Sequence, residues 1–190
     1  MRFASALITL LVAAVAAYAG VKFMDSVGPD ISSADSGGRA SVKEVDAGSD
    51  ESLVEAKNFG KVLAKIKDRF GAEARLVNLR LEPSRVDVQI PQGTKTVVLE
   101  YNNEAEVTTD VTTDTDLSSN PNVALITDVP AAAPQRIMKK VVKKTGKPID
   151  NLSYMAITTF GDGVGWYVSL KEGEETTWRA ELDGRKVRAQ

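Results

Sequence analysis

Residues 59–71 read FGKVLAKIKDRFG, and residues 134–146 read PQRIMKKVVKKTG. Both stretches carry apolar residues at the spacing of one helix face, basic residues on the opposite face, and a terminal glycine that stops the helix. The sequence therefore predicts one amphipathic helix that occurs twice, 75 residues apart. The matching apolar positions are Val62, Leu63 and Ile66 in the first helix, and Ile137, Met138 and Val141 in the second.

A strand-like run and then a hairpin follow each predicted helix. Alternating apolar residues predict the buried face of every strand. Turns are expected at Gly93 and Gly173, and again at Asn102-Asn103 and Asp183-Gly184. The predicted inward residues are Val77, Leu79, Leu81, Val86, Val88, Ile90, Val97, Leu99 and Tyr101 in the first half, and Leu152, Tyr154, Ala156, Trp166, Val168, Leu170, Trp178, Ala180 and Leu182 in the second.

These elements predict an α+β fold made of two tandem repeats, each a helix plus three antiparallel strands. The first repeat is placed at residues 53–108 and the second at residues 131–190. A connector at residues 109–130 joins them and contains one more possible strand, from Val123 to Ile126. About 135 residues are then available for folding, which is enough for one compact domain or two small ones.

The N-terminal segment, residues 1–24, predicts where in the cell the protein is located. Nineteen uncharged residues separate Arg2 from Lys22, close to the length that crosses a bilayer as a helix. Two interpretations stay open: an uncleaved transmembrane anchor, or a signal peptide cleaved after Ala19 in the pattern Ala-Tyr-Ala. Because Arg2 and the amino terminus favour the cytoplasmic side, the remainder is expected outside the cytoplasm, as a single-pass membrane protein or, after cleavage, as a secreted one.

Residues 25–52 are rich in Ser, Gly and Asp and show no apolar periodicity, which predicts a flexible tether.

The composition of the whole chain excludes several functions. The 190 residues include no histidine and no cysteine, which excludes Ser-His-Asp triads, Cys/His zinc sites and disulfides. A net charge of −2 predicts no nucleic-acid partner. A hydrolase could still work with two carboxylates or a Ser-Lys pair, but no such pair is placed in the sequence as if to share a pocket. We therefore expect a protein that is not an enzyme and carries no cofactor and no Cys/His metal site.

The stretch FGDGVGWYVSL, residues 160–170, resembles a phosphate-binding glycine loop. A phosphate loop needs its glycines between a strand and a helix, so that helix N-terminal amides face the anion. Here Gly161, Gly163 and Gly165 lie between two predicted strands, so the stretch predicts a turn. Gly165 is interpreted as a bulge that directs Trp166 inward.

A polar loop from Asp114 to Asn122 places oxygen-bearing side chains at alternate positions, as a calcium loop does. Ser119 stands where such a loop has glycine, and Leu125 stands where it has glutamate. Calcium binding and an ordinary loop of Asx-turns are the two interpretations left open.

Two surfaces are candidate binding sites. The outward positions of the second hairpin are expected to form an exposed sheet face where a protein or peptide docks. The second helix has a basic side that could contact acidic lipid headgroups or an anionic partner, or could simply be solvated. The candidate binding face is Tyr167, Ser169, Thr177, Arg179 and Glu181, and the candidate basic surface is Arg136, Lys139, Lys140, Lys143 and Lys144.

The end of the second repeat, TWRAELDGRKVRA at residues 177–189, resembles a PepSY-like repeat, with an alternating strand, an acidic residue, a Gly turn and a short return strand. The first copy, VVLEYNNEAEV at residues 97–107, has Asn-Asn in place of Asp-Gly. PepSY-like domains are associated with the regulation of peptidases and with the cell envelope. The tandem organisation is also similar to that of the beta-lactamase inhibitor proteins, whose disulfides are absent here.

The function expected from this sequence is that of a non-catalytic, membrane-tethered extracytoplasmic binding or regulatory module, with a protein or envelope partner. The alternative is a secreted inhibitor of a hydrolase or peptidase, which requires cleavage after Ala19. Measuring the mass of the mature N-terminus separates these two functions.

Overall fold

The computed structural model describes residues 43–161, 163–173 and 175–190. The described residues belong to the unit formed by residues 40–190. The predicted membrane segment and the tether up to residue 42 therefore lie outside the described residues. Across the part of the chain that is described, no helix has the length and apolarity that a bilayer crossing needs.

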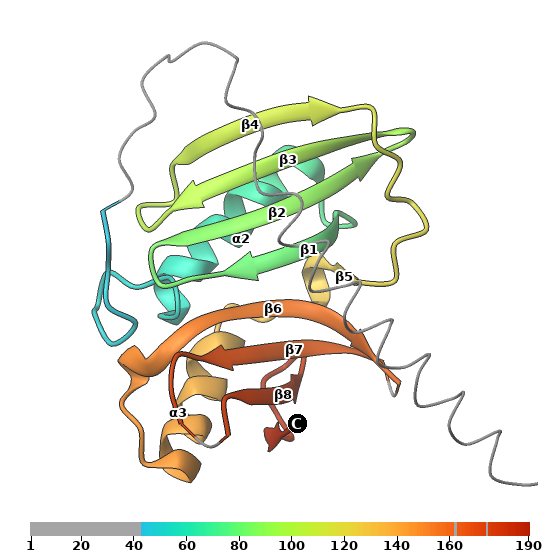
Figure 1. The fold of residues 1–190 in the computed structure, drawn as a ribbon. Helices are drawn as coiled ribbons and strands as arrows, with labels where there is room; N and C mark the ends of the chain where they lie inside the picture. The colour runs from blue at the N-terminus through green and yellow to red at the C-terminus, as the bar shows by residue number, and fades with distance from the viewer. Residues whose placement is uncertain (1–42, 162, 174) are drawn as a thin grey trace, which may run out of the picture. The chain divides into compact units, whose positions relative to one another are not determined.

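The described unit is an α+β fold with two α-helices and nine strands (Figure 1). In chain order, its first half contains α2 (Ala56–Phe70), β1 (Arg75–Leu81), β2 (Arg85–Gln92), β3 (Lys95–Asn102), β4 (Val107–Thr113) and β5 (Val123–Leu125). The short helix η1 (Ile126–Asp128) leads into α3 (Ala133–Thr145), η2 (Ile149–Asn151), β6 (Leu152–Phe160), β7 (Gly163–Leu170), β8 (Thr177–Glu181) and β9 (Arg188–Ala189).

The strands form one antiparallel sheet in the order β4-β3-β2-β1-β6-β7-β8-β9, with β5 also paired to β1. The two halves of this sheet meet where β1 pairs with β6, through Arg80 opposite Ala156. The earlier part of β1 pairs instead with β5, through Val77 opposite Val123. A bulge between Val77 and Arg80 separates these two pairings, and Asn78 in it has a φ of 50°.

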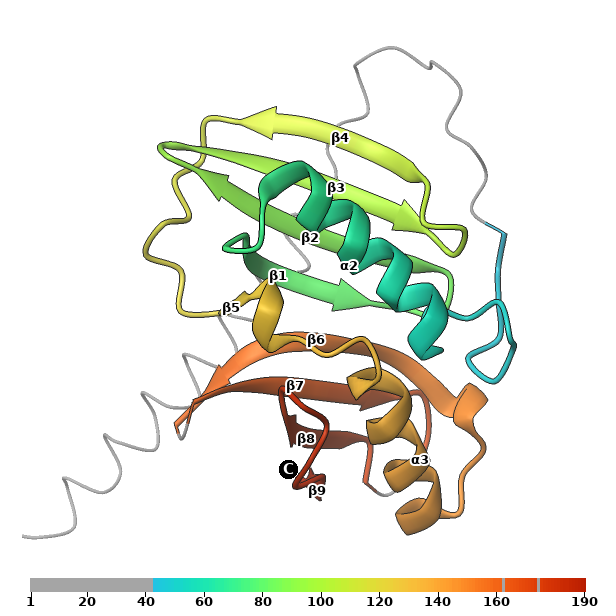
Figure 2. The ribbon, with the colours of Figure 1, turned by 180° about the vertical axis from the view of Figure 1, so that it is seen from behind.

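Both helices lie against the same face of the sheet, as Figure 2 shows from behind. The residues predicted to form their apolar faces are buried, which confirms the helical periodicity. Gly71 and Gly146 end the two helices with φ of 88° and 68°, in the region that favours glycine. Gly93, Gly173 and Gly184 also have positive φ at the predicted turns.

The core is a single cluster that draws residues from both helices and from strands of both halves. Phe59 of α2 contacts Trp166 of β7 edge to face, with ring centroids 6.2 Å apart. The indole N–H of Trp166 donates to the Leu182 carbonyl oxygen at 3.1 Å. Because helix and strand from different halves share this contact, the halves are packed into one core.

Strand bulges change the side of the sheet that three predicted inward residues face, although two of them, Val77 and Ala156, are buried as predicted. Val77 pairs with Gln89, on the face opposite the helices, because the bulge in β1 shifts its register. A second bulge between Leu152 and Tyr154 shifts β6, so Tyr154 and Ala156 face away from the helices. Met155 and Ile157 are buried in the core instead. Alternation in sequence cannot reveal an inserted residue, and this explains the error.

Two predicted boundaries, the start of the connector and the end of the tether, also differ from those in the structure. The strand β4 continues to Thr113 and so extends into the predicted connector. Ala47 and Ser52, at the end of the predicted tether, are buried. The Gly48 N–H donates to Asp150 Oδ1 at 2.8 Å, and the Asn58 side-chain amide donates to the Ser52 carbonyl oxygen at 2.9 Å. The folded unit therefore begins before Leu53.

Candidate binding face

The side of the sheet opposite α2 and α3 is covered by no helix of the described residues (Figure 1). We call this side the uncovered face. Its residues are those that alternate with the core positions along each strand. On β7 and β8, Tyr167 lies opposite Arg179, and Ser169 lies opposite Thr177. Glu181 pairs with Gly165 in the same ladder. The five residues predicted as a binding face therefore share one side of two neighbouring strands.

Arginine and tyrosine side chains form a row across this face, from β1 to β8. The Arg80 guanidinium lies 4.1 Å from the centroid of the Tyr154 ring, within cation–π range. The Tyr154 and Tyr167 rings are 6.0 Å apart. Burial raises the pKa of the Tyr167 hydroxyl, and the neighbouring Tyr154 raises it further, so this group is neutral at physiological pH. The row, which we call the Tyr-Arg row, consists of Arg80, Tyr154, Tyr167 and Arg179.

Sequence reasoning missed Arg80 and Tyr154. Tyr154 was predicted to be inward, and only the register of β6 against β7 places it beside Tyr167. Arg80 reaches it because β1 and β6 are neighbours in the sheet, although their sequences are far apart. No pattern within either segment of the sequence predicts the pairing of β1 with β6.

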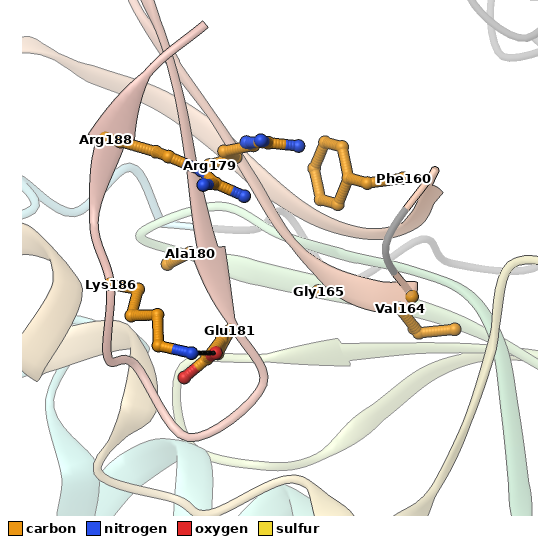
Figure 3. Close-up of a pocket in the computed structure, with 9 residues that line it drawn as sticks. Phe160, Val164, Gly165, Arg179, Ala180, Glu181, Lys186 and Arg188 are labelled. Atoms are coloured by element: carbon orange, nitrogen blue, oxygen red, sulfur yellow. Dashed lines mark ion pairs between the residues drawn. The ribbon is translucent and has the colours of Figure 1, made fainter.

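A small pocket of about 140 Å³ lies at the β8 and β9 end of the uncovered face (Figure 3). Phe160 forms one wall, and the Arg179 guanidinium lies 5.5 Å from the centroid of its ring. Arg188 of β9 pairs directly with Arg179 of β8. Lys186 and Glu181 form an ion pair of 2.6 Å at the opposite side. The lining residues are Phe160, Gly163, Val164, Gly165, Arg179, Ala180, Glu181, Lys186 and Arg188.

Gly163 and Gly165 line this pocket and lie within β7, and Gly161 follows the end of β6. The next element after the stretch is a strand and not a helix, in agreement with the turn interpretation, but only Gly161 of the three glycines lies outside the strands. The predicted bulge at Gly165 is wrong, because β6 and β7 pair without a register shift from Tyr154 to Phe160. A Cβ at Gly165 would lie 2.4 Å from the Ala180 carbonyl oxygen and 3.4 Å from the Phe160 ring. Glycine is needed here because the backbone of β8 and the Phe160 ring occupy the space of a side chain.

The β1 and β2 part of the uncovered face differs, because charged groups there are paired with each other. Arg80 Nε lies 2.9 Å from Glu82 Oε1, and Arg85 Nε lies 3.3 Å from Asp87 Oδ2. Glu100 is 4.0 Å from the Arg85 guanidinium. Burial raises the pKa of Asp87 to about 6; Arg85 opposes this shift, while Glu100 adds to it.

Asp87→Asn is expected to stabilise the fold at neutral pH and to weaken its pH dependence. The folded state keeps the Asp87 proton up to a pKa of about 6, whereas the ordinary value is 3.8. Between these values the folded state binds more protons than the unfolded chain. The contribution of Asp87 to stability is therefore fully present below pH 3.8 and is lost as the pH rises through about 6.

The gain for Asp87→Asn at neutral pH should be about 1 to 2 kcal/mol, after allowance for solvent screening of a side chain that is 35% exposed. Urea unfolding of both proteins at about pH 5 and about pH 7.5 measures it. Equal losses of stability in the two proteins between these pH values would contradict the assignment to Asp87.

The five residues of the predicted basic surface fall into two groups, three that bond to the loop between β8 and β9 and two that do not. The Arg136 guanidinium donates to the Asp183 carbonyl oxygen, and Lys140 Nζ donates to the Gly184 carbonyl oxygen at 3.1 Å. Lys144 Nζ donates to the Val187 carbonyl oxygen at 2.7 Å. These three side chains hold the loop between β8 and β9 against α3. Lys139 and Lys143 are exposed to solvent.

The loop from Asp114 to Asn122 contains the Asx-turns that were one of its two interpretations. The Ser118 N–H donates to Asp116 Oδ1 at 2.8 Å, and the Asn122 N–H donates to Asn120 Oδ1 at 2.8 Å. Asn122 Oδ1 accepts the Thr159 N–H at 2.8 Å, which fastens the loop to β6. Over the described residues, no three His, Cys, Asp or Glu side chains are grouped to hold a metal ion.

Comparison with known proteins finds a similar fold in one solved structure. No family model matches the sequence, so the resemblance to PepSY-like domains has no support from one. No curated protein matches it either. Among solved structures, the fold is similar to a candidate lipoprotein from Clostridium difficile 630, with a TM-score of 0.55 and 14% sequence identity. The match covers 73% of this chain and 97% of that chain, so nearly all of that protein shares the fold.

Proposed function

We propose that this protein is a non-catalytic binding module of the cell envelope, and that a protein partner docks on its uncovered face at the Tyr-Arg row. The observation that supports this most is the row itself, in which two tyrosines and two arginines lie side by side on an open sheet surface. Tyrosine and arginine are enriched in protein interfaces and among the residues that dominate their binding energy.

The size of the pocket favours binding over catalysis. Pockets that enclose a small substrate or cofactor usually measure about 300 to 1,000 Å³, and the pocket beside Arg179 measures about 140 Å³. The absence of histidine and cysteine from the sequence also removes the commonest general base and the thiol nucleophile.

Two observations support an envelope location. The apolar N-terminal segment is long enough to serve as an anchor or a signal segment. The similar structure belongs to a candidate lipoprotein, which is a class of membrane-anchored protein. We propose a single-pass membrane protein whose folded unit lies outside the cytoplasm. A secreted inhibitor remains the alternative and depends on cleavage after Ala19, outside the described residues.

We also propose that the two halves arose as tandem copies, PepSY-like in organisation. Supporting this, α2 followed by β1, β2 and β3 has the same element order as α3 followed by β6, β7 and β8. The buried residues of the two helices occupy corresponding positions. Only the second half carries both tyrosines of the Tyr-Arg row, so the proposed docking function belongs chiefly to that half.

The double substitution Tyr154→Ser with Tyr167→Ser is expected to reduce cross-linking of the partner by at least about tenfold, because aromatic residues of this kind commonly contribute about 2 kcal/mol each to an interface. Full-length protein is cross-linked in its native envelope, and the adducts are identified by mass spectrometry. The matched control is Lys139→Ser with Lys143→Ser on α3, which should leave the adduct unchanged.

Circular dichroism of the purified double variant establishes that it is folded before the adducts are compared. An unchanged yield of the same adduct from a folded tyrosine variant would contradict docking at the Tyr-Arg row. Loss of the adduct from the lysine control alone would place the partner on α3 instead.

A further inference from the structure

We propose that the outward side of α2 and α3 lies on the anionic phospholipid surface of the bilayer that carries the N-terminal anchor. This inference rests on the anchor of the proposed function, and it concerns a side of the molecule that the proposed docking site does not use. We call this side the helix face. It consists of the exposed residues of α2 and α3, on the opposite side of the sheet from the Tyr-Arg row (Figure 2).

Basic residues are concentrated in these two helices. Together α2 and α3 contain ten of the 24 lysines and arginines of the chain, but only one of its 26 acidic residues, Asp68. The whole chain has a net charge of −2, so the positive charge of the helices is separated from an excess of negative charge elsewhere. This separation gives the helix face a positive potential, which attracts an anionic surface.

Most of these charges are not neutralised by an ion pair within the described part of the chain. Arg69 is the exception, because it lies 2.6 Å from Asp110 of β4. Arg136, Lys140 and Lys144 donate to backbone carbonyl oxygens, which are neutral acceptors and leave the cationic charge in place. The other six are exposed, and none of them is paired with a described carboxylate: Lys57, Lys61, Lys65, Lys67, Lys139 and Lys143.

The exposed lysines follow lines along the helices. Lys57, Lys61 and Lys65 are four residues apart in α2, which places them on one side of the helix over about 12 Å of its length. Lys139 and Lys143 have the same spacing in α3. Charges spread in this way contact several separate anions and do not converge on one small ligand. A lipid surface presents anions in that arrangement, and lysines near it are attracted to acidic headgroups.

The two helices form one layer, so both lines of lysines can contact the same bilayer. Both helices pack on the same face of the sheet (Figure 2). The Gln135 side-chain amide of α3 donates to the carboxylate of Glu55, the residue before α2. An added Cβ at Gly60 of α2 would lie 3.3 Å from the Cβ of Ala131, shortly before α3, which shows how closely the helices approach each other there.

The length of chain before the folded unit permits this contact. Eighteen residues, 25–42, separate the predicted membrane segment from the first described residue, Lys43. A chain of that length spans at most about 60 Å, because an extended residue covers about 3.4 Å. The anchor therefore holds the unit near the bilayer and raises the concentration of lipid headgroups around it. With the helix face on the lipid, the uncovered face is directed away from the bilayer, toward a protein partner.

Paramagnetic relaxation by lipid headgroups tests this contact. Full-length ¹⁵N-labelled protein is placed in nanodiscs of phosphatidylcholine, with or without about 30% phosphatidylglycerol, and both kinds contain a small fraction of gadolinium-chelating lipid. In anionic nanodiscs, the amides of Lys61 and Lys65 should relax at least about fivefold faster than those of Ser169 and Thr177 on the uncovered face. The difference should disappear in neutral nanodiscs, and also in about 1 M salt, where the screening length is about 3 Å.

Lys61→Gln with Lys65→Gln should lower the docked population in anionic nanodiscs by about tenfold, because two of the attracted charges are lost. Both side chains are exposed and glutamine suits a helix, so this variant is expected to fold. The matched control, Lys43→Gln with Lys95→Gln, removes the same charge from two lysines outside the helices and should leave the relaxation unchanged. Equal relaxation of the two faces, or undiminished relaxation in the α2 variant, would overturn the inference.

An acidic polypeptide is the other kind of macromolecule that exposed lysines attract. Polyglutamate is therefore added to the protein in neutral nanodiscs, and the amide shifts of α2 are followed. Saturable binding of polyglutamate, together with no enhanced relaxation of α2 in anionic nanodiscs, would assign the helix face to an acidic protein and overturn the lipid contact.

The outcomes separate this inference from the proposed function. If α2 relaxes as expected while the tyrosine double variant cross-links normally, the lipid contact stands and docking at the Tyr-Arg row fails. If the two faces relax equally while the tyrosine double variant loses its adduct, docking stands and the lipid contact fails. Protein that does not co-purify with either kind of nanodisc would refute the anchor, and the lipid contact with it.

Discussion

Gly165→Ala is expected to destabilise the protein by about 3 kcal/mol, the upper part of the usual range for an added group in a packed site. The new Cβ would be placed 2.4 Å from the Ala180 carbonyl oxygen, which belongs to the backbone of the next strand and not to a movable side chain. Relief requires β7 and β8 to separate, which weakens the pairing of Trp166 with Ala180.

Gly161→Ala is the matched control, because an added Cβ there has nothing within 4 Å. It should change the free energy of unfolding by less than about 0.5 kcal/mol. Urea unfolding of both variants measures the difference. If the two alanine variants were equally stable, β8 would not approach Gly165 as closely as the structure shows, and the shape of the pocket would be wrong.

Trp166→Ala is expected to cost about 4 kcal/mol, within the range for truncating a buried aromatic side chain. The residue is fully buried, its ring contacts Phe59 edge to face, and its indole N–H is bonded to the Leu182 carbonyl oxygen. The substitution leaves a cavity and an acceptor without its donor. Because Phe59 belongs to α2, the substitution should also weaken the packing of α2 against the first half of the sheet.

Chemical unfolding followed by circular dichroism measures this loss, with Thr177→Ala on the uncovered face as the control. Thr177→Ala should cost less than about 1 kcal/mol. The shared core also predicts that wild type unfolds in a single transition. Separate transitions for the two halves, with only the second affected by Trp166→Ala, would contradict a common core.

The helices and their ends could be predicted from the sequence because their signals are local. One apolar stripe per helix and a glycine after the last turn are sufficient to place α2 and α3. The same holds for the hairpin of β2 and β3, where Val86, Val88 and Ile90 alternate with polar residues and are buried. In each case the pattern lies within one element and needs no knowledge of its neighbours.

The pairing that joins the two halves of the sheet could not be predicted in this way. The pairing of β1 with β6 and β5 connects segments far apart in sequence, and two bulges change which residues face the helices. The predicted alternation places Tyr154 in the core for this reason, whereas the bulge brings Met155 there instead. A bulge adds one residue without any change in composition, so only the paired strand reveals it.

The candidate site was predicted in part. Alternation placed Tyr167 and Arg179 on one side of the second hairpin, and their pairing agrees with this. Phe160 and Arg188 join Arg179 in one pocket only through the folding of a turn and a short edge strand, which alternation does not describe. The basic side of α3 was predicted as one surface because the sequence does not show that the loop before β9 accepts three of its hydrogen bonds.

Docking on the uncovered face is tested most directly by position-specific photo-cross-linking. A photoreactive benzoylphenylalanine replaces Ser169 on the uncovered face or Lys139 on α3, one at a time, in the full-length protein within its native envelope. The proposed function predicts one partner that is cross-linked from position 169 and not from position 139. Cross-linking of that partner from position 139, with none from position 169, would contradict it.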